Sequence, residues 1–169
     1  MRRPDKGLFL ALKVHPEDAQ TIAAFVEARG IKPIAPEDLH VTLLRLNRGV
    51  FDLEGFPSLA DVRAGVGSYG LYSRAEHGIK RAAYVAVESD PVAATRAALL
   101  KGYKGIPNPF TTPEGALRPA FRRMMRAPHL TLTFHRSEHL LTIPFPLSGI
   151  RLSKVTASCP DPLWHRRHL

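Results

Sequence analysis

The sequence predicts one domain, residues 1–169, of the α+β or α/β class with two similar halves. A strand–helix–strand pattern occurs near both ends of the chain, and no linker composition separates them. The 15 prolines in 169 residues are about twice the average share, which favours short elements joined by stiff turns. A composition of 44% hydrophobic and 23% charged residues is typical of a globular domain and excludes intrinsic disorder.

The first half contains a strand, a helix and a second strand. Residues 7–14 are a short apolar run bounded by charges, typical of a buried strand. A helix is expected to begin at Pro16, with two acidic residues in its first turn, and to end at Gly30. The other expected elements of this half are a strand over Leu39–Leu46 and, after it, a loop or a short helix over Phe56–Arg63.

The second half repeats this order. Asp90 as N-cap and Pro91 at the first helical position predict a helix that ends at Gly102. Strands are expected over Gly70–Ser73, Ala82–Glu88, His129–Phe134, Leu140–Phe145 and Ile150–Ser158. Residues 103–123 are expected to form either a loop flanking a site or a disordered excursion, and residues 160–169 a basic tail whose order is left open.

The charge balance favours polyanionic partners. Lysine and arginine number 24 against 15 acidic residues, which gives a net charge of +9 and a pI near 10.2. Nucleic acid, nucleotides or acidic membrane surfaces would suit such an excess. The alternative is a solubility or compositional bias without a binding role.

Cysteine content and hydropathy bear on the compartment. Cys159 is the single cysteine, which excludes an intrachain disulfide and a four-cysteine zinc site and favours a reducing, cytoplasmic setting. The apolar stretch from Leu8 to Leu12 is broken by Lys13, and no run approaches the roughly 20 apolar residues that span a bilayer. We therefore expect no membrane association.

Two of the expected strands carry the same pattern, a histidine followed two residues later by a threonine. His40 and Thr42 lie in one strand, and His129 and Thr131 lie in the other. Side chains at i and i+2 lie on one face of a strand, while the intervening apolar residues point to the core. Each strand therefore presents an imidazole and a hydroxyl side by side.

This pair of groups suits phosphoryl chemistry. Imidazole can take or give a proton near neutral pH, and a threonine hydroxyl can donate a hydrogen bond to a phosphate oxygen that gains negative charge. Two facing units would hold one phosphodiester between opposed histidines, one deprotonating the nucleophile and the other protonating the leaving oxygen. Because hydroxyls and nearby arginines can stabilise the charge, we expect neither metal nor cofactor.

A single H-x-[ST] pattern is a weak signal. His135 and Ser137 also match it, but Arg136 replaces the inward-facing apolar residue, so we assign that match no role. The informative feature is the duplication, with each copy in an apolar strand of a different half. The alternative is two ordinary strand histidines, hydrogen-bonded on a half-exposed sheet face.

The two motif segments, PEDLHVTLL and APHLTLTF, together with the opening GLFLALKVHPEDAQTI, resemble the two-histidine (2H) phosphoesterase superfamily. The likeness is strongest to its LigT branch of RNA 2′,3′-cyclic phosphodiesterases, also called 2′-5′ RNA ligases, and covers most of the chain. It implies an α+β fold of two pseudo-symmetric lobes, each an antiparallel-rich sheet with helices outside, around a central groove. It further implies that His40, Thr42, His129 and Thr131 form the catalytic set, with His129 as base and His40 as acid.

Four other side chains are candidate substrate contacts. Arg45 lies five residues after His40, so it would reach the phosphate only if the strand twists or bulges. Arg126, before the second motif, could line a groove entrance or belong to a solvated basic surface. Tyr103 and Phe110 could stack on a base, although packing is the simpler role.

Two further positions receive structural interpretations. Tyr84 is expected in the core. His135 and His139 have a spacing seen in helical metal sites, but no third ligand is evident, so no metal site is expected.

The resulting hypothesis is a metal-independent, monomeric phosphodiesterase acting on nucleotides with 2′,3′-cyclic phosphate ends or 2′-5′ linkages. One alternative is degradation of cyclic oligonucleotide immune signals, as in viral and phage members of the superfamily. A second is 2′-5′ RNA ligation, since the same acid–base pair can run the transesterification in reverse. The non-enzymatic alternative is a basic module that binds RNA or a nucleotide without turnover.

Overall fold

The structure, a computed structural model, describes residues 8–46, 62–74, 79–101, 112–114, 116, 118 and 128–158. Its elements, in chain order, are β1 (Leu8–Val14), α1 (Pro16–Glu27), η1 (Pro36–Asp38), β2 (His40–Leu46), β3 (Val62–Arg74), β4 (Ile79–Glu88), α2 (Asp90–Lys101), β5 (His129–Thr133), η3 (Glu138–Thr142) and β6 (Gly149–Ser158), where η marks a 3-10 helix.

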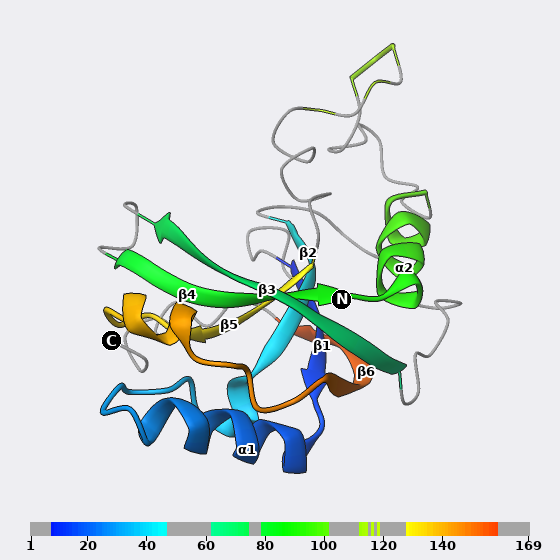
Figure 1. Ribbon diagram of the computed structural model, residues 1–169. Helices are drawn as coiled ribbons and strands as arrows, with labels where there is room; N and C mark the ends of the chain where they lie inside the picture. The colour runs from blue at the N-terminus through cyan, green and yellow to red at the C-terminus, as the bar shows by residue number, and fades with distance from the viewer. Residues whose placement is uncertain are drawn as a thin grey trace.

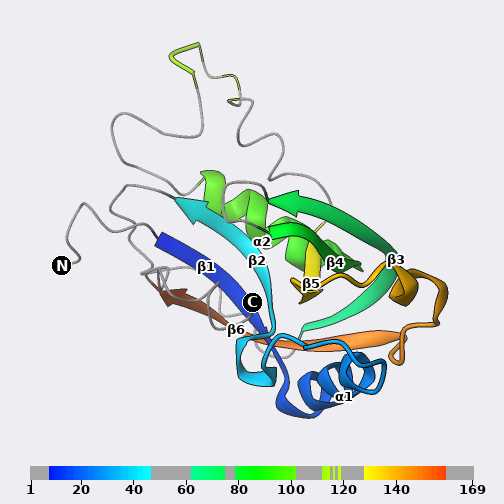
Figure 2. The ribbon, with the colours of Figure 1, turned by 90° about the vertical axis from the view of Figure 1, so that its left-hand side faces the viewer.

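The six strands form one antiparallel sheet that closes into a barrel, in the order β1-β2-β5-β4-β3-β6. The strand β6 closes the ring because it pairs with β1 on one side and β3 on the other. Both α-helices lie outside the strands, α1 at one end and α2 at the other (Figures 1 and 2). The predicted α+β class, with antiparallel strands and helices outside, is confirmed.

Two strand–helix–strand units, β1-α1-β2 and β4-α2-β5, form the two halves. They meet where β2 pairs antiparallel with β5. The helices cross between the halves: α1 contacts β5 of the second unit, and α2 contacts β2 of the first. Each helix therefore supports the strand that carries the other half's histidine motif.

Local signals explain the two helices. Pro16 begins α1, Glu17 and Asp18 occupy its first turn, and Gly30 takes the positive φ of 70° just beyond its end. The cap of α2 lies one residue earlier than expected, because the Ser89 hydroxyl, not Asp90, accepts a hydrogen bond from the Val92 N–H at 3.3 Å. Neither helix, among the described residues, has the length and apolar character needed to cross a bilayer.

The core runs across the barrel as a row of cross-strand partners. Leu12, Val41, Leu130 and Val85 are consecutive partners on β1, β2, β5 and β4, and each is fully buried. Because side chains alternate along a strand, the residues on either side of this row point to the opposite face of the sheet. Burying four β-strand side chains in one row fixes the register of all four strands.

The predicted strand over Leu140–Phe145 is wrong. Glu138–Thr142 is a 3-10 helix, closed by hydrogen bonds from the Leu140 N–H to the Ser137 carbonyl (2.9 Å) and from the Ile143 N–H to the Leu140 carbonyl (3.1 Å). Pro144 and Pro146 lack the N–H groups that a strand ladder needs, which explains why the apolar alternation here does not form a strand.

The strand predicted over Gly70–Ser73 is the end of the longer β3, which begins at Val62. The loop or short helix predicted over Phe56–Arg63 is therefore wrong at Val62 and Arg63, which belong to β3, and the rest of that stretch lies outside the described residues. The tail 160–169 and most of the loop 103–123 also lie outside them.

Candidate active site

The register between β2 and β5 brings the two motifs together. Val41 is the partner of Leu130 in this antiparallel pair, so His40 comes opposite Thr131 and Thr42 comes opposite His129. Val41 and Leu130 are fully buried, whereas the four motif residues are half-buried on the other face. The two imidazoles and two hydroxyls therefore come from one block of four neighbouring positions on the sheet.

The outer neighbours of this block differ between the halves. His40 has Lys13 of β1 as its cross-strand partner, whereas His129 has Ala86 of β4. Thr131 has Tyr84 of β4 as its partner, whereas Thr42 has Ala11. The first half thus contributes a cation beside its histidine, and the second contributes an aromatic ring beside its threonine.

A backbone carbonyl fixes the tautomer of His40. Its Nδ1 lies 2.6 Å from the carbonyl oxygen of Asp38, the last residue of the 3-10 helix η1 before β2. A carbonyl oxygen can only accept, so Nδ1–H is the donor and Nε2 is the ring atom that exchanges protons. His40 keeps this bond whether Nε2 is protonated or not, so the ring can gain or lose a proton without reorienting.

The ring of His129 lies against Tyr84. Their ring centroids are 5.1 Å apart with an interplanar angle of 54°. Tyr84 is half-buried, not enclosed in the core as predicted, because it lies on the same face of the sheet as the motifs. A strand tyrosine between buried apolar residues gave no sequence signal of this contact, since it depends on the register of β4 against β5.

Arg96 of α2 holds β2 next to the motif. Its Nε donates to the Leu43 carbonyl at 3.0 Å, and one terminal nitrogen donates to the Thr42 carbonyl at 2.9 Å. The side chain is buried, and burial lowers the pKa of its guanidinium from the usual range. The side chain thus joins α2 to the β2 backbone at the first motif.

Arg96 and Lys13 also lie at the site, and the sequence pattern did not predict either of them there. The Lys13 ammonium donates to the Glu37 carbonyl at 2.7 Å, across from His40. The one available signal was the single lysine that interrupts an apolar strand. Arg96 gave none, because an arginine in an exposed-looking alanine-rich helix is common.

The four remaining candidate contacts lie, as whole residues or in their side chains, outside the described residues. Arg45 lies in β2 with its backbone opposite Phe9, but its side chain is outside the described part of the structure. Arg126, Tyr103 and Phe110 fall outside the described residues altogether. Within the described ranges, no three His, Cys, Asp or Glu side chains gather as metal ligands.

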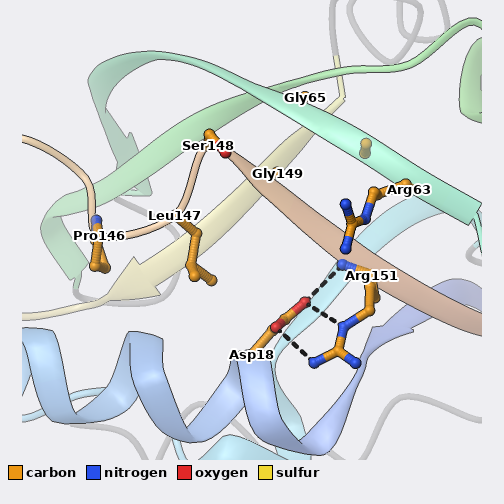
Figure 3. Close-up of a pocket in the computed structure, with 9 residues that line it drawn as sticks. Asp18, Arg63, Gly65, Pro146, Leu147, Ser148, Gly149 and Arg151 are labelled. Carbon is orange, nitrogen blue, oxygen red and sulfur yellow. Dashed lines mark hydrogen bonds and ion pairs between the residues drawn. The ribbon is translucent and has the colours of Figure 1, made fainter.

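A cavity of about 550 Å³ lies elsewhere, between α1, β3 and β6, and shares no lining residue with the motifs (Figure 3). At its edge, Asp18 accepts hydrogen bonds from the Arg151 backbone N–H (2.7 Å) and from its guanidinium (3.3 and 3.0 Å). Burial alone would raise the pKa of Asp18, but these bonds outweigh it, so the pKa lies below its ordinary value. The pair fastens α1 to β6.

Comparison with known structures identifies the fold. E. coli LigT complexed with 3′-AMP superposes with a TM-score of 0.60 at 17% identity, covering 93% of this chain and 88% of LigT. A structure described as a phosphoesterase gives a TM-score of 0.58 at 14% identity, with the same coverage. The TT0787 protein of Thermus thermophilus gives 0.54 at 21% identity, covering 90% of this chain and 82% of TT0787.

The chain has the same fold as E. coli LigT. At these identities the likeness establishes architecture, not substrate. No protein-family model matches the sequence, and no curated protein matches it. The likeness to LigT is thus one of strand and helix arrangement, and the paired motifs of this chain lie on two adjoining strands.

Proposed function

We propose that this protein is a metal-independent phosphodiesterase that hydrolyses nucleotide phosphodiesters, with 2′,3′-cyclic phosphate ends or 2′-5′ linkages as substrates. The observation that carries the proposal is the pairing of Val41 with Leu130, which gives two His-x-Thr units a common face of the sheet. The fold neighbours support a phosphoesterase of the 2H class.

The proposed reaction has two proton transfers. One imidazole takes a proton from water as the water oxygen attacks phosphorus. The other imidazole gives a proton to the ribose oxygen as its bond to phosphorus breaks, leaving a phosphomonoester and a free hydroxyl. The Thr42 and Thr131 hydroxyls donate to the phosphoryl oxygens, on which negative charge grows. Proton transfer back through water restores both rings.

We assign His129 as the base and His40 as the acid. The assignment follows the resemblance to the 2H phosphoesterases, and the Nδ1–H bond of His40 to the Asp38 carbonyl is compatible with it, because that bond persists in the imidazolium and leaves Nε2–H as the proton to be delivered. In 2′-5′ ligation a 5′-hydroxyl takes the place of water, so the same imidazole deprotonates the nucleophile and the same imidazole protonates the leaving ribose oxygen.

A nucleotide substrate has two supports. E. coli LigT has been crystallised with 3′-AMP, ATP, NADP+ and phosphate. This chain carries a net charge of +9, and Lys13 places one cation beside the first motif. We infer RNA or nucleotide ligands, and a monomer acting in the cytoplasm, with Cys159 reduced.

The direct test is turnover in the presence of EDTA. Purified protein is incubated with 2′,3′-cyclic mononucleotides, 2′-5′ dinucleotides and cyclic di- and trinucleotides. His40→Ala and His129→Ala should each lower the rate about 10²–10⁴-fold, and the double variant should be little worse than either single one, because the pair acts as a unit. His139→Ala, an exposed histidine of η3, is the matched control and should retain the wild-type rate.

The same panel separates the alternatives. Near-wild-type turnover in His40→Ala would refute the paired mechanism. Preference for the cyclic di- and trinucleotides would favour degradation of cyclic oligonucleotide signals, and joining of a 2′,3′-cyclic end to a 5′-hydroxyl would favour ligation. Binding of these nucleotides without any product would leave the RNA- or nucleotide-binding module as the function.

A further inference from the structure

We infer that Tyr84 is a positioning residue that holds the His129 imidazole in place, and that Gly70 exists to make room for it. The inference rests on the proposed function, since positioning matters for turnover only if His129 acts on substrate. The three residues His129, Tyr84 and Gly70 lie on the neighbouring strands β5, β4 and β3. Neither the paired motifs nor the likeness to other folds gives Tyr84 or Gly70 a role.

The register of β4 against its two neighbouring strands determines what Tyr84 lies beside. Tyr84 on β4 has Thr131 as its cross-strand partner on one side and Gly70 on the other. Tyr84 is also the diagonal neighbour of His129, whose direct partner is Ala86. Diagonal pairs on one face remain within reach when one member is a long aromatic side chain. The tyrosine thus lies between the second motif and a glycine.

The Tyr84 and His129 rings are 5.1 Å apart at 54°, within the range of favourable tilted aromatic pairs. A ring held on one side by tyrosine loses freedom of rotation about its χ angles. Such restraint keeps the reacting nitrogen aligned with the phosphorus, and misplacement of about 1 Å can cost on the order of 10²-fold in rate.

A Cβ built on Gly70 would overlap the ring carbon and the hydroxyl oxygen at the tip of Tyr84. The tyrosine ring therefore lies directly over the β3 backbone, in space that any other residue would fill. Gly67, three residues earlier on β3, differs: its Cβ would meet the end of the flexible Glu88 side chain at 2.9 Å and the Ala86 Cβ at 3.2 Å, and no ring.

This arrangement predicts how substitutions at Gly70 and Tyr84 combine. Gly70→Ala should push the Tyr84 ring toward His129 and disturb the imidazole, but only while the ring is there. Tyr84→Ala should release the imidazole, and adding Gly70→Ala to it should change nothing more. Tyr84→Phe should rescue, since the ring and not the hydroxyl makes the contact. Gly67→Ala is the matched control for crowding on the same face.

The primary readout is NMR of histidine-labelled protein, with the His129 C–H signals assigned by their loss in His129→Gln among eight histidines. Tyr84→Ala and Gly70→Ala should both move these signals through the lost or altered ring current. The double variant should match Tyr84→Ala, and Gly67→Ala should match wild type. Unmoved His129 signals in Tyr84→Ala, or an undiminished effect of Gly70→Ala in the Tyr84→Ala background, would overturn the inference.

The kinetic readout uses the best 2′,3′-cyclic nucleotide of the panel. Tyr84→Ala should lower kcat about tenfold or more with KM little changed, and Tyr84→Phe should restore most of it. A rise in KM alone would make Tyr84 a substrate contact and overturn the positioning role, as would an unchanged kcat. If the wild-type protein turns over no nucleotide, the proposed function fails, and the NMR comparison still decides whether Tyr84 orients the ring.

Discussion

Replacing Arg96 tests whether α2 fixes the geometry of the first motif. Arg96→Met replaces a buried cation with an uncharged, unbranched side chain. The Thr42 and Leu43 carbonyl oxygens then lose their guanidinium donors. Each buried acceptor that loses its donor costs about 1–3 kcal/mol. The gain from no longer desolvating a guanidinium offsets part of this sum, so we expect the free energy of unfolding to fall by about 2–4 kcal/mol.

The assay is urea unfolding followed by far-UV circular dichroism, with wild type, Arg96→Met and Arg96→Lys compared at one pH. Lysine keeps the charge but lacks the guanidinium group that reaches two carbonyls, so the free energy of unfolding of Arg96→Lys should lie between those of wild type and Arg96→Met. Arg136→Met is the control: this arginine is 89% exposed and faces Glu138 at 3.8 Å, and its loss should cost less than about 0.5 kcal/mol.

Two results would refute this reasoning. An Arg96→Met free energy within about 0.5 kcal/mol of wild type would mean that water or neighbouring donors replace the guanidinium. If the free energy of unfolding falls as expected but the folded protein keeps its turnover rate, the hydrogen bond from Arg96 to the Thr42 carbonyl does not affect the geometry of the first motif.

Three further outcomes are expected. Asp18→Asn should lower stability at neutral pH by about 1–3 kcal/mol and flatten its acid dependence. The pKa of Asp18 is lower in the folded protein than in the unfolded chain. Its carboxylate therefore stabilises the fold above the ordinary pKa, and this stabilisation is lost as the pH falls through the folded pKa. Urea unfolding measured from pH 7 to 2 checks this dependence. Thr133→Val should cost about 2–4 kcal/mol in urea unfolding, because the buried Thr133 hydroxyl donates to the Lys32 carbonyl (2.7 Å) and accepts from the His135 N–H (3.1 Å). Lys13→Met should raise KM for a nucleotide severalfold and weaken its salt dependence in steady-state assays; equal KM and salt slope would contradict a role for this cation.

Local signals were sufficient to predict the strand–helix–strand units and the placement of both motifs in strands. Pro16 and Gly30 bound α1 because first-turn and cap preferences act over a few residues. The same reasoning failed over Leu140–Phe145. The alternation of apolar residues there is typical of a strand, but Pro144 and Pro146 lack the backbone N–H groups that strand pairing needs.

Non-local features could not be predicted. Closure of the barrel by β6 depends on pairing between strands far apart in the chain. The positions of Lys13 beside His40 and of Tyr84 beside Thr131 depend on that register, because one residue of slip would send each side chain to the other face. The motifs could be found in the sequence, but their neighbours required the assembled sheet.

The central claim is that two imidazoles, one from each half, act on a single phosphorus atom. The measurement that tests it most directly is a crystal structure of the protein with inorganic phosphate. We predict one phosphate whose oxygens lie within about 2.7–3.2 Å of Nε2 of His40, Nε2 of His129 and the hydroxyls of Thr42 and Thr131. Ring nitrogens too far apart to reach one phosphate, or an anion bound only beside Arg63 in the cavity of Figure 3, would contradict the account.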